Sequence, residues 1–163
     1  MKWGPYSDLD VLRKLNSLKC LSLGGATRVA SIEPLTSLPG LQSLELYQTY
    51  LLDGLSSLGQ LTSLTRLVCG GSIDSDRNVK IRSLDWVRDL SGLAELRLPG
   101  TRLIDSDLSV LLELPELLIL VLPLRRSYRK QVFQFASSSA AFAGVAKDYE
   151  ECDDYLAEIK VSR

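Results

Sequence analysis

Two segments, LQSLELYQT (residues 41–49) and LAELRLPGT (residues 93–101), decide the fold of this chain. In each, a leucine is followed after three residues by a Leu-x-Leu pair. That pair predicts a short strand, because alternate residues of a strand face the same side. The register recurs five times, and its last position falls on Leu23, Leu46, Cys69, Leu98 and Leu122, which are 23, 23, 29 and 24 residues apart. A period of this length is typical of a solenoid, a stack of similar coils.

The segments between the strands have a regular pattern of their own. Their apolar residues are spaced by three, as at Leu9, Leu12, Leu15 and Leu18. In an α-helix, which turns by about 100° per residue, four residues at this spacing would spread around half of the helix. The spacing instead fits 3₁₀ or polyproline turns, which return to the same side at every third residue. We therefore expect each coil to consist of one strand and one return segment, with the leucines of successive coils stacked in a shared core.

These segments resemble the repeats of the leucine-rich-repeat family, whose core pattern is LxxLxLxxN, and the resemblance covers residues 9–122. The segments IEPLTSLPGL and LSSLGQLTSL are similar to the short bacterial, internalin-like class with repeats of about 22 to 23 residues. The resemblance implies a curved solenoid with parallel strands on its concave face. The asparagine that the family has after each strand is replaced here by Ala26, Thr49, Ser72 and Thr101. Hydroxyls can partly support the backbone turn at these places, whereas alanine cannot.

The register divides the chain into two parts. Residues 1–123 form the predicted solenoid of five repeats, with an insertion at 70–80 that we expect to be a rim loop. Residues 124–163 form a predicted C-terminal capping segment, in which residues 132–135 alternate like an edge strand and a helix follows at about 140–160. The apolar stripe of this helix consists of Phe142, Val145, Tyr149, Cys152, Leu156 and Ile159. We expect the stripe to cover the last coil, and the alternative is a helix-pair or dimer interface.

The predicted fold class is therefore an α/β solenoid with about five parallel strands on the concave face and a C-terminal strand/helix cap. The composition argues against most catalytic functions, because the chain has no histidine, the commonest general base and a usual zinc ligand. Its 19 basic and 20 acidic side chains nearly cancel, which disfavours nucleic acid and anionic membranes as partners. Three widely spaced cysteines suit a reducing compartment, and no secretory signal or membrane-spanning stretch is visible. We expect a cytoplasmic protein without a cofactor.

The insertion at 70–80 has acidic residues at spacings similar to those of a calcium loop. Asp74, Asp76, Asn78 and Asp85 stand at suitable positions. However, Val79 occupies the place where that loop needs a glycine for its sharp turn. We interpret these residues as turn formers in a solvated loop and predict no metal site.

The outward positions of the strands are where a partner would bind. The candidate binding residues are Ser43, Glu45, Tyr47, Arg66, Val68, Glu95, Arg97, Ile119 and Val121. Neighbouring parallel strands place Arg66 beside Glu95 and diagonal to Glu45, so that these charges can neutralise one another. The apolar candidates, of the kind that dominates interfaces, are Tyr47, Val68, Ile119 and Val121. For the last two, the alternative is burial beneath the C-terminal segment.

We therefore expect a protein-protein interaction module, not an enzyme, that uses the concave sheet and the rim loops to bind a protein partner. A sheet of this size offers a footprint of roughly 200 to 300 Å², whereas a standard interface buries about 800 Å² per partner. The partner must then also contact the rim loop, the turns near Tyr47 or the C-terminal helix. The alternative is that the chain is the C-terminal sensor end of a larger signalling or nucleotide-switch protein. The sequence leaves the oligomeric state open.

Overall fold

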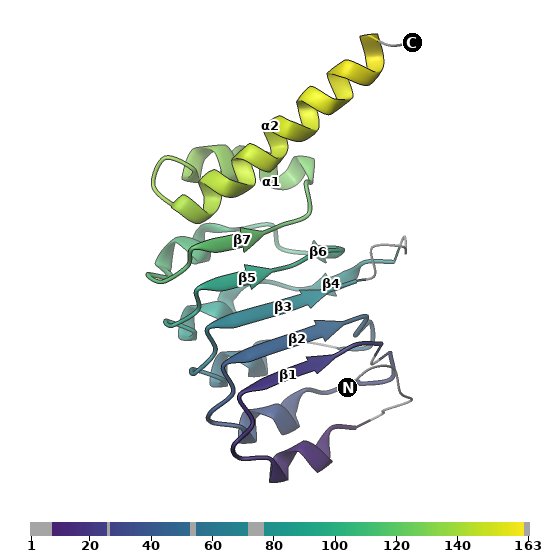
Figure 1. Cartoon of the computed structure of the whole chain (residues 1–163), viewed down its shortest axis with the longest axis vertical. Helices are drawn as coiled ribbons and strands as arrows, with labels where there is room; N and C mark the ends of the chain where they lie inside the picture. Colours follow the sequence, from purple (N-terminus) through teal and green to yellow (C-terminus); the bar gives the residue numbers. More distant parts are fainter. Residues whose placement is uncertain (1–7, 26, 53–54, 72–76, 162–163) are drawn as a thin grey trace.

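The computed structural model describes residues 8–25, 27–52, 55–71 and 77–161, with side chains as far as Ile159. The chain winds into five stacked coils, each of which adds one strand to a parallel sheet of order β1-β2-β3-β5-β7 (Figure 1). These strands are β1 (Cys20–Leu23), β2 (Ser43–Tyr47), β3 (Arg66–Gly70), β5 (Glu95–Arg97) and β7 (Ile119–Val121). The predicted α/β solenoid with five parallel strands is confirmed.

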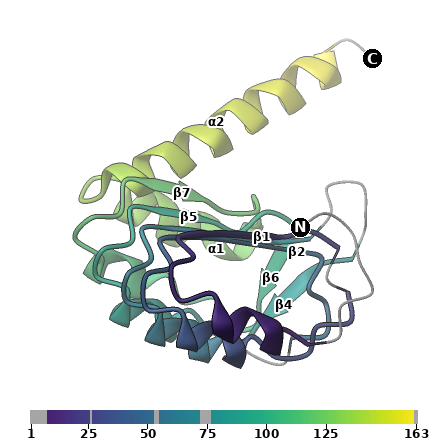
Figure 2. The ribbon, with the colours of Figure 1, turned by 60° about the horizontal axis from the view of Figure 1, so that its bottom comes forward.

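Each coil returns through a short 3₁₀ helix on the side opposite to the sheet (Figure 2). These helices are η1 (Asp10–Lys14), η2 (Glu33–Ser37), η3 (Ser56–Gln60), η4 (Asp85–Asp89) and η5 (Ser109–Glu113). The threefold spacing has a direct backbone cause, because the N–H of most of these leucines donates to the carbonyl oxygen of the apolar residue three positions earlier. Leu12 N–H, for example, donates to Leu9 O at 2.9 Å, and Leu15 N–H donates to Leu12 O at 2.9 Å. The prediction of threefold turns is therefore confirmed.

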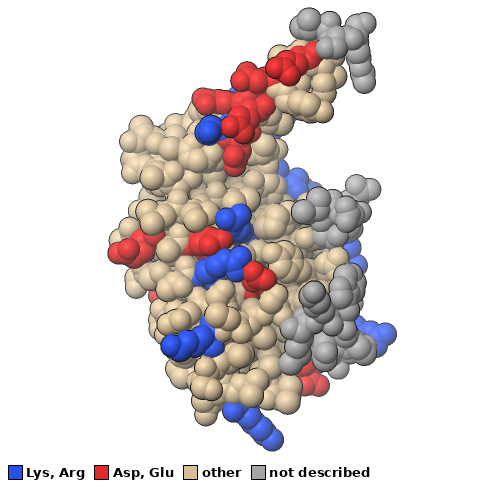
Figure 3. All heavy atoms as spheres, viewed as in Figure 1, with Lys and Arg blue, Asp and Glu red and all other residues tan. Residues whose placement is uncertain are grey.

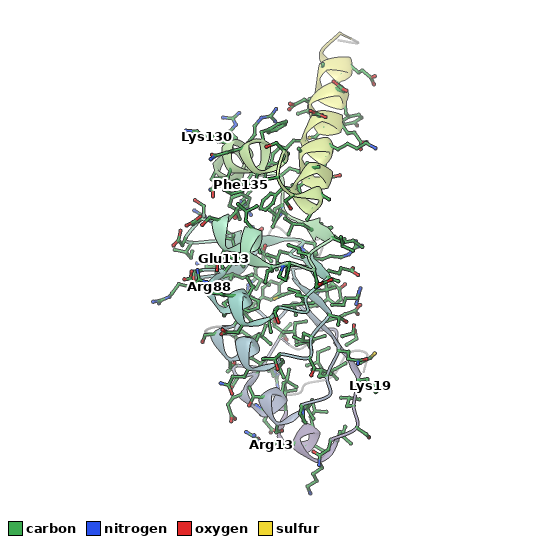
Figure 4. The ribbon with its side chains drawn as sticks, turned by 90° about the vertical axis from the view of Figure 1, so that its left-hand side faces the viewer. Arg13, Lys19, Arg88, Glu113, Lys130 and Phe135 are labelled. Carbon is green, nitrogen blue, oxygen red and sulfur yellow. The ribbon has the colours of Figure 1, made fainter. Side chains whose placement is uncertain are left out.

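The strand leucines form the centre of the core. Leu44, Leu67 and Leu96 are neighbours in the sheet register, and each is 0% exposed. Burying one such side chain contributes about 1.5 to 3 kcal/mol, but only if the next coil covers it. On the opposite side, Arg88 of η4 and Glu113 of η5 point toward each other and link two coils through a 2.7 Å ion pair (Figure 4).

The insertion of the third coil is only partly a loop. Its last residues, Val79 and Lys80, belong to a strand, β4 (Val79–Ile81), which pairs in parallel with β6 (Thr101–Leu103). The prediction of a loop over 70–80 is wrong for these residues and for Gly70, the last residue of β3, because Val79 and Ile81 turn into the core while the backbone of β4 pairs with β6. The remaining part of the insertion, residues 72–76, lies outside the described residues.

Two threonines occupy the position of the family's asparagine within the described residues. Thr101 is 0% exposed, and its hydroxyl donates to Leu98 O at 2.8 Å, as expected for a hydroxyl that supports the turn. Thr49 is also 0% exposed, but its hydroxyl has no hydrogen-bond partner among the residues that the structure describes. The predicted support by hydroxyls is therefore confirmed at Thr101 and wrong at Thr49. The other two positions, Ala26 and Ser72, lie outside the described residues.

The edge strand predicted at residues 132–135 is wrong, because the segment belongs to helix α1 (Arg126–Phe135). Tyr128 and Val132 are four residues apart and therefore share one helix face, which is buried against the last coil. The Tyr128 hydroxyl accepts a hydrogen bond of 3.0 Å from a backbone N–H of β6. Phe133 is 38% exposed, so the alternation that suggested a strand does not mark a buried face.

Helix α2 (Ala140–Val161) has two different halves. In the first half, Phe142, Val145 and Tyr149 are buried where the helix packs on α1 and β7. The second half, which we call the overhang (residues 150–161), leads away from the coils (Figures 1 and 2). The predicted C-terminal helix is thus present, but its apolar stripe is fully buried only as far as Tyr149. Within the described residues, no helix has the length and apolar content needed to cross a membrane.

Candidate functional site

The nine candidate residues chosen from the sequence all lie on β2, β3, β5 and β7. The register aligns them across the sheet in rows. One row runs Ser43, Arg66, Glu95, Ile119, and the next runs Glu45, Val68, Arg97, Val121. Tyr47 starts a third row beside Gly70. The predicted alignment of the outward positions is therefore present, because the Leu-x-Leu pairs fix which side chains face out.

Four charged residues at the middle of this face form one ion-paired cluster, which we call the charged quartet: Glu45, Arg66, Glu95 and Arg97 (Figure 3). Arg66 lies 2.6 Å from Glu45 and 3.2 Å from Glu95, and Arg97 also pairs with Glu95. Two carboxylates thus meet two guanidinium groups. The predicted neutralisation of these charges by one another is confirmed.

Further hydrogen bonds hold the quartet in place. Ser22 donates from its hydroxyl to Glu45 at 2.8 Å, and Arg66 donates to the Ser43 hydroxyl at 3.4 Å. The hydrogen bond from Arg66 lowers the pKa of Glu45 below its ordinary value. Glu45 is therefore ionised throughout the neutral range, and the quartet is an ordered polar patch without net charge.

Val68 is the one apolar candidate for which the prediction of exposure is wrong. It is 1% exposed, although its register neighbours Glu45 and Arg97 are accessible to solvent. A valine is short, and here it stands between longer side chains that the ion pairs of the quartet hold over the sheet. The sequence period predicts the face of the sheet on which a residue lies, but it does not predict how far the neighbouring side chains extend over that residue.

The accessible apolar residues of the concave face lie toward its ends. Ile119 of β7 is 44% exposed, and Val121 of the same strand is half-buried. Helix α2 packs against β7, yet it leaves Ile119 open, so the alternative of burial beneath the C-terminal segment is wrong for this residue. Tyr47 is half-buried at the end of β2.

A second surface, which the sequence analysis missed, lies along β4 and β6. It is a groove of about 1000 Å³, which we call the rim groove. Its apolar lining includes Tyr50, Leu51, Leu52, Trp86 and Ile104, and its basic lining consists of Arg77, Lys80, Arg82 and Arg102. Lys80 and Arg102 are register neighbours, and both are exposed. The signal was present in the triplets VKI and TRL, each of which places one basic residue between two buried ones.

Comparison with solved structures decides what kind of solenoid this is. Internalin C2 from Listeria monocytogenes is similar at 27% identity with a TM-score of 0.54, over 72% of this chain and 46% of that protein. An internalin (inlF) from the same organism is similar at 23% identity with a TM-score of 0.59, over 76% of this chain and 36% of that protein. The chain is a leucine-rich-repeat solenoid.

This leucine-rich-repeat chain spans less than half the length of either internalin. The similarity at 23% identity concerns the fold alone. No protein-family model matches the sequence, and the search of curated proteins finds no similar one. What the fold supports in general is a protein-interaction module, and the binding surface has to be argued from this chain's own residues.

Metal and thiol chemistry have little support in the part of the solenoid that the structure describes. Its described residues contain no group of three His, Cys, Asp or Glu side chains placed to bind a metal ion. Asp74 and Asp76, which resemble part of a calcium loop, lie outside the described residues. Cys69 is 0% exposed, and burial raises its pKa to about 12, so that the reactive thiolate does not form near neutral pH. Cys69 is therefore a core residue.

Proposed function

We propose that this leucine-rich-repeat chain is a non-enzymatic module that binds a protein partner on its concave face, with the contact centred near β7. The observation that supports this proposal is the exposure of Ile119 on the sheet, directly beside the charged quartet. A large apolar side chain that stays 44% exposed at the first position of β7 is the type of residue that dominates interfaces. Val121 extends this apolar area along the same strand.

The charged quartet suits such a contact by limiting its entropic cost. Long side chains usually lose conformational freedom when a partner covers them, at about 0.5 to 1.5 kcal/mol for each. Arg66 and Glu95 are already held by each other at 3.2 Å, so less freedom remains to be lost. The quartet also carries no net charge. A partner with a polar but weakly charged surface therefore fits this region better than a strongly charged one.

The size of the sheet indicates where else the partner must contact the chain. Parallel strands about 4.8 Å apart give a concave footprint of roughly 200 to 300 Å², well below the about 800 Å² per partner of a standard interface. The first half of α2 packs on β7 and borders the same end of the sheet. We therefore expect the partner to extend from Ile119 onto α2, with Tyr47 near the far edge of the contact.

The experiment compares two substitutions of matched exposure. Ile119 on the concave face is 44% exposed, and Leu112 in η5 on the opposite side is 42% exposed. Wild type, Ile119→Glu and Leu112→Glu are used as bait in the native host, the captured partner is identified by mass spectrometry, and its affinity for each variant is then measured by calorimetry. Ile119→Glu should weaken binding at least about tenfold, whereas Leu112→Glu should bind like wild type. Equal affinities of all three would refute the concave-face proposal.

Two further parts of the proposal concern the setting of the protein. We propose a cytoplasmic location, because the three cysteines are unpaired in the structure and suit a reducing compartment. Fractionation of the native host with an antibody to this chain tests it. The alternative of a sensor end in a larger signalling or nucleotide-switch protein stays a prediction, and the length of the native protein on the same immunoblot tests it.

A further inference from the structure

The rim groove has an amphipathic lining that calls for an occupant of matching chemistry. Its apolar part is open to solvent, since Leu51 is 52% and Ile104 is 63% exposed. Its cationic part includes Lys80, Arg82 and Arg102, which make no ion pair with any other described residue. No described residue that lines the groove is acidic. An occupant with apolar side chains flanked by carboxylates would match both parts.

The overhang of α2 has this chemistry. Residues 150–161 contain five acidic residues and one lysine, and acidic side chains gather on the projecting part of the helix (Figure 3). Tyr155 is 63% and Leu156 is 49% exposed. Glu151 and Glu158 stand four residues before and three residues after Tyr155, so the three share one side of the helix. This side offers a large aromatic residue between two carboxylates.

We propose that the overhang of one copy of this chain docks in the rim groove of a second copy. The helix leads away from the coils of its own chain, so it is available to another molecule (Figures 1 and 2). Its 12 residues measure about 18 Å at about 1.5 Å per residue. A groove of about 1000 Å³ accommodates several side chains of one helix face, and a helix that lays its apolar side into a groove is a common recognition mode.

Charge disfavours the simpler pairing of one overhang with another. Asp153 lies on the flank of the apolar stripe opposite to Glu151 and Glu158, so both flanks are acidic. Asp153 is bound to Arg129 of α1 at 2.6 Å, and Glu151 lies 3.6 Å from Lys147 of its own helix in an exposed pair. Two such helices side by side would place carboxylates against carboxylates, whereas the groove offers cations.

The proposed contact joins two different surfaces of the same chain. Such a heterologous contact gives a closed dimer if two copies exchange their helices, and otherwise it gives an open chain of copies. In both cases its strength depends on protein concentration and on salt, because the charges concerned are near the surface. The contact is separate from Ile119 and from the concave face, so it does not rest on the function proposed above.

The first measurement is sedimentation velocity of the full chain at several protein concentrations. Wild type should associate as concentration rises in about 0.05 M NaCl, and the association should weaken in about 0.5 M NaCl, where the Debye length is shorter. A wild type that stays monomeric in low salt up to millimolar concentration overturns the proposal.

Charge reversal on each side tests the two surfaces separately. The groove variant is Lys80→Glu with Arg102→Glu, and the helix variant is Glu151→Lys with Glu158→Lys. Each should weaken association at least about tenfold, because like charges then face each other. Circular dichroism checks that each variant keeps the wild-type fold.

Matched controls carry the same change of charge elsewhere. Lys14→Glu with Lys19→Glu alters exposed lysines of the first coil, and Asp89→Lys with Glu116→Lys alters exposed carboxylates of the coils that do not line the rim groove. Both controls, and Ile119→Glu, should associate like wild type. If the helix variant loses association and the groove variant does not, the overhangs pair with each other and the proposal is wrong.

The decisive step is to mix the groove variant with the helix variant. Each variant alone should associate at least about tenfold more weakly than wild type. In the mixture, the acidic helix of one variant meets the basic groove of the other, and the reversed helix meets the reversed groove. Association should therefore return to within about tenfold of the wild-type strength. Failure of the mixture to associate, while both variants remain folded, overturns the proposal.

Discussion

The two halves of α2 carry the same sequence pattern and have different surroundings. Phe142, Val145 and Tyr149 continue as Cys152, Leu156 and Ile159 at the spacing of one helix face. The first three are at most 4% exposed, because α1 and β7 lie against them. Leu156 in the overhang is 49% exposed. An apolar stripe therefore identifies a face that can be covered, and whether a cover exists depends on how far the last coil extends.

The buried half is anchored by specific contacts as well as by burial. The rings of Phe135 and Phe142 meet edge to face, with centroids 5.2 Å apart. The Tyr149 hydroxyl donates to Arg125 O at 2.7 Å. The overhang keeps a link to α1 through Arg129 and Asp153, an exposed pair of a kind that contributes little to stability. The helix thus acts as a cap in its first half and as a projecting arm in its second.

The largest expected difference between the halves comes from removing one apolar side chain from each. Phe142→Ala should lower the free energy of unfolding by about 3 to 5 kcal/mol, because it leaves a cavity beside Phe135. Leu156→Ala should change it by no more than about 0.5 kcal/mol. Urea denaturation of both variants at low protein concentration measures the two effects. Similar losses for the two would mean that the overhang packs as the first half does.

A smaller difference is expected for the two tyrosines of the helix. Tyr149→Phe removes the donor to Arg125 O and should cost about 1 kcal/mol, since the carbonyl loses a partner. Tyr155→Phe, at a side chain that is 63% exposed, should cost close to nothing. The same denaturation measurement compares them. A loss at Tyr155 as large as that at Tyr149 would contradict the division of the helix.

The coils were predictable because the same repeat supplies both the buried leucines of one coil and the residues of the next coil that bury them. Leu44, Leu67 and Leu96 share one position of the register. The repeat that predicts one of these leucines therefore also predicts the neighbouring leucine that helps to bury it. The 3₁₀ turns followed for the same reason, since a leucine at every third residue fixes both the hydrogen bond and the buried side. Pairing of Arg66 with Glu95 also depended only on register.

The features that the sequence did not reveal depend on contacts outside the repeat. Val68 is buried by the longer side chains that the charged quartet holds around it, and pairwise register does not give their conformation. The segment at 132–135 is helical because Tyr128, upstream of the alternation that suggested a strand, fills the end of the core. The rim groove required β4 to pair with β6 across an insertion of irregular length. In each case a distant neighbour decides the outcome, and the local pattern is compatible with either result.

The smallest expected effect is a difference in how the stability contributions of the two halves of α2 depend on pH. Burial raises the pKa of Tyr149 above its ordinary value of about 10. In the unfolded chain this tyrosine ionises near pH 10, whereas in the folded chain it stays neutral to higher pH. Its contribution to stability is therefore complete below about pH 10 and is lost as the pH rises through the raised pKa. The difference in urea midpoint between wild type and Tyr149→Phe should narrow from pH 8 to pH 11, while Tyr155→Phe should follow wild type throughout. A difference that stays constant over this range would show that Tyr149 titrates as it does in the unfolded chain, and that the first half of α2 is less well covered than its exposed area indicates.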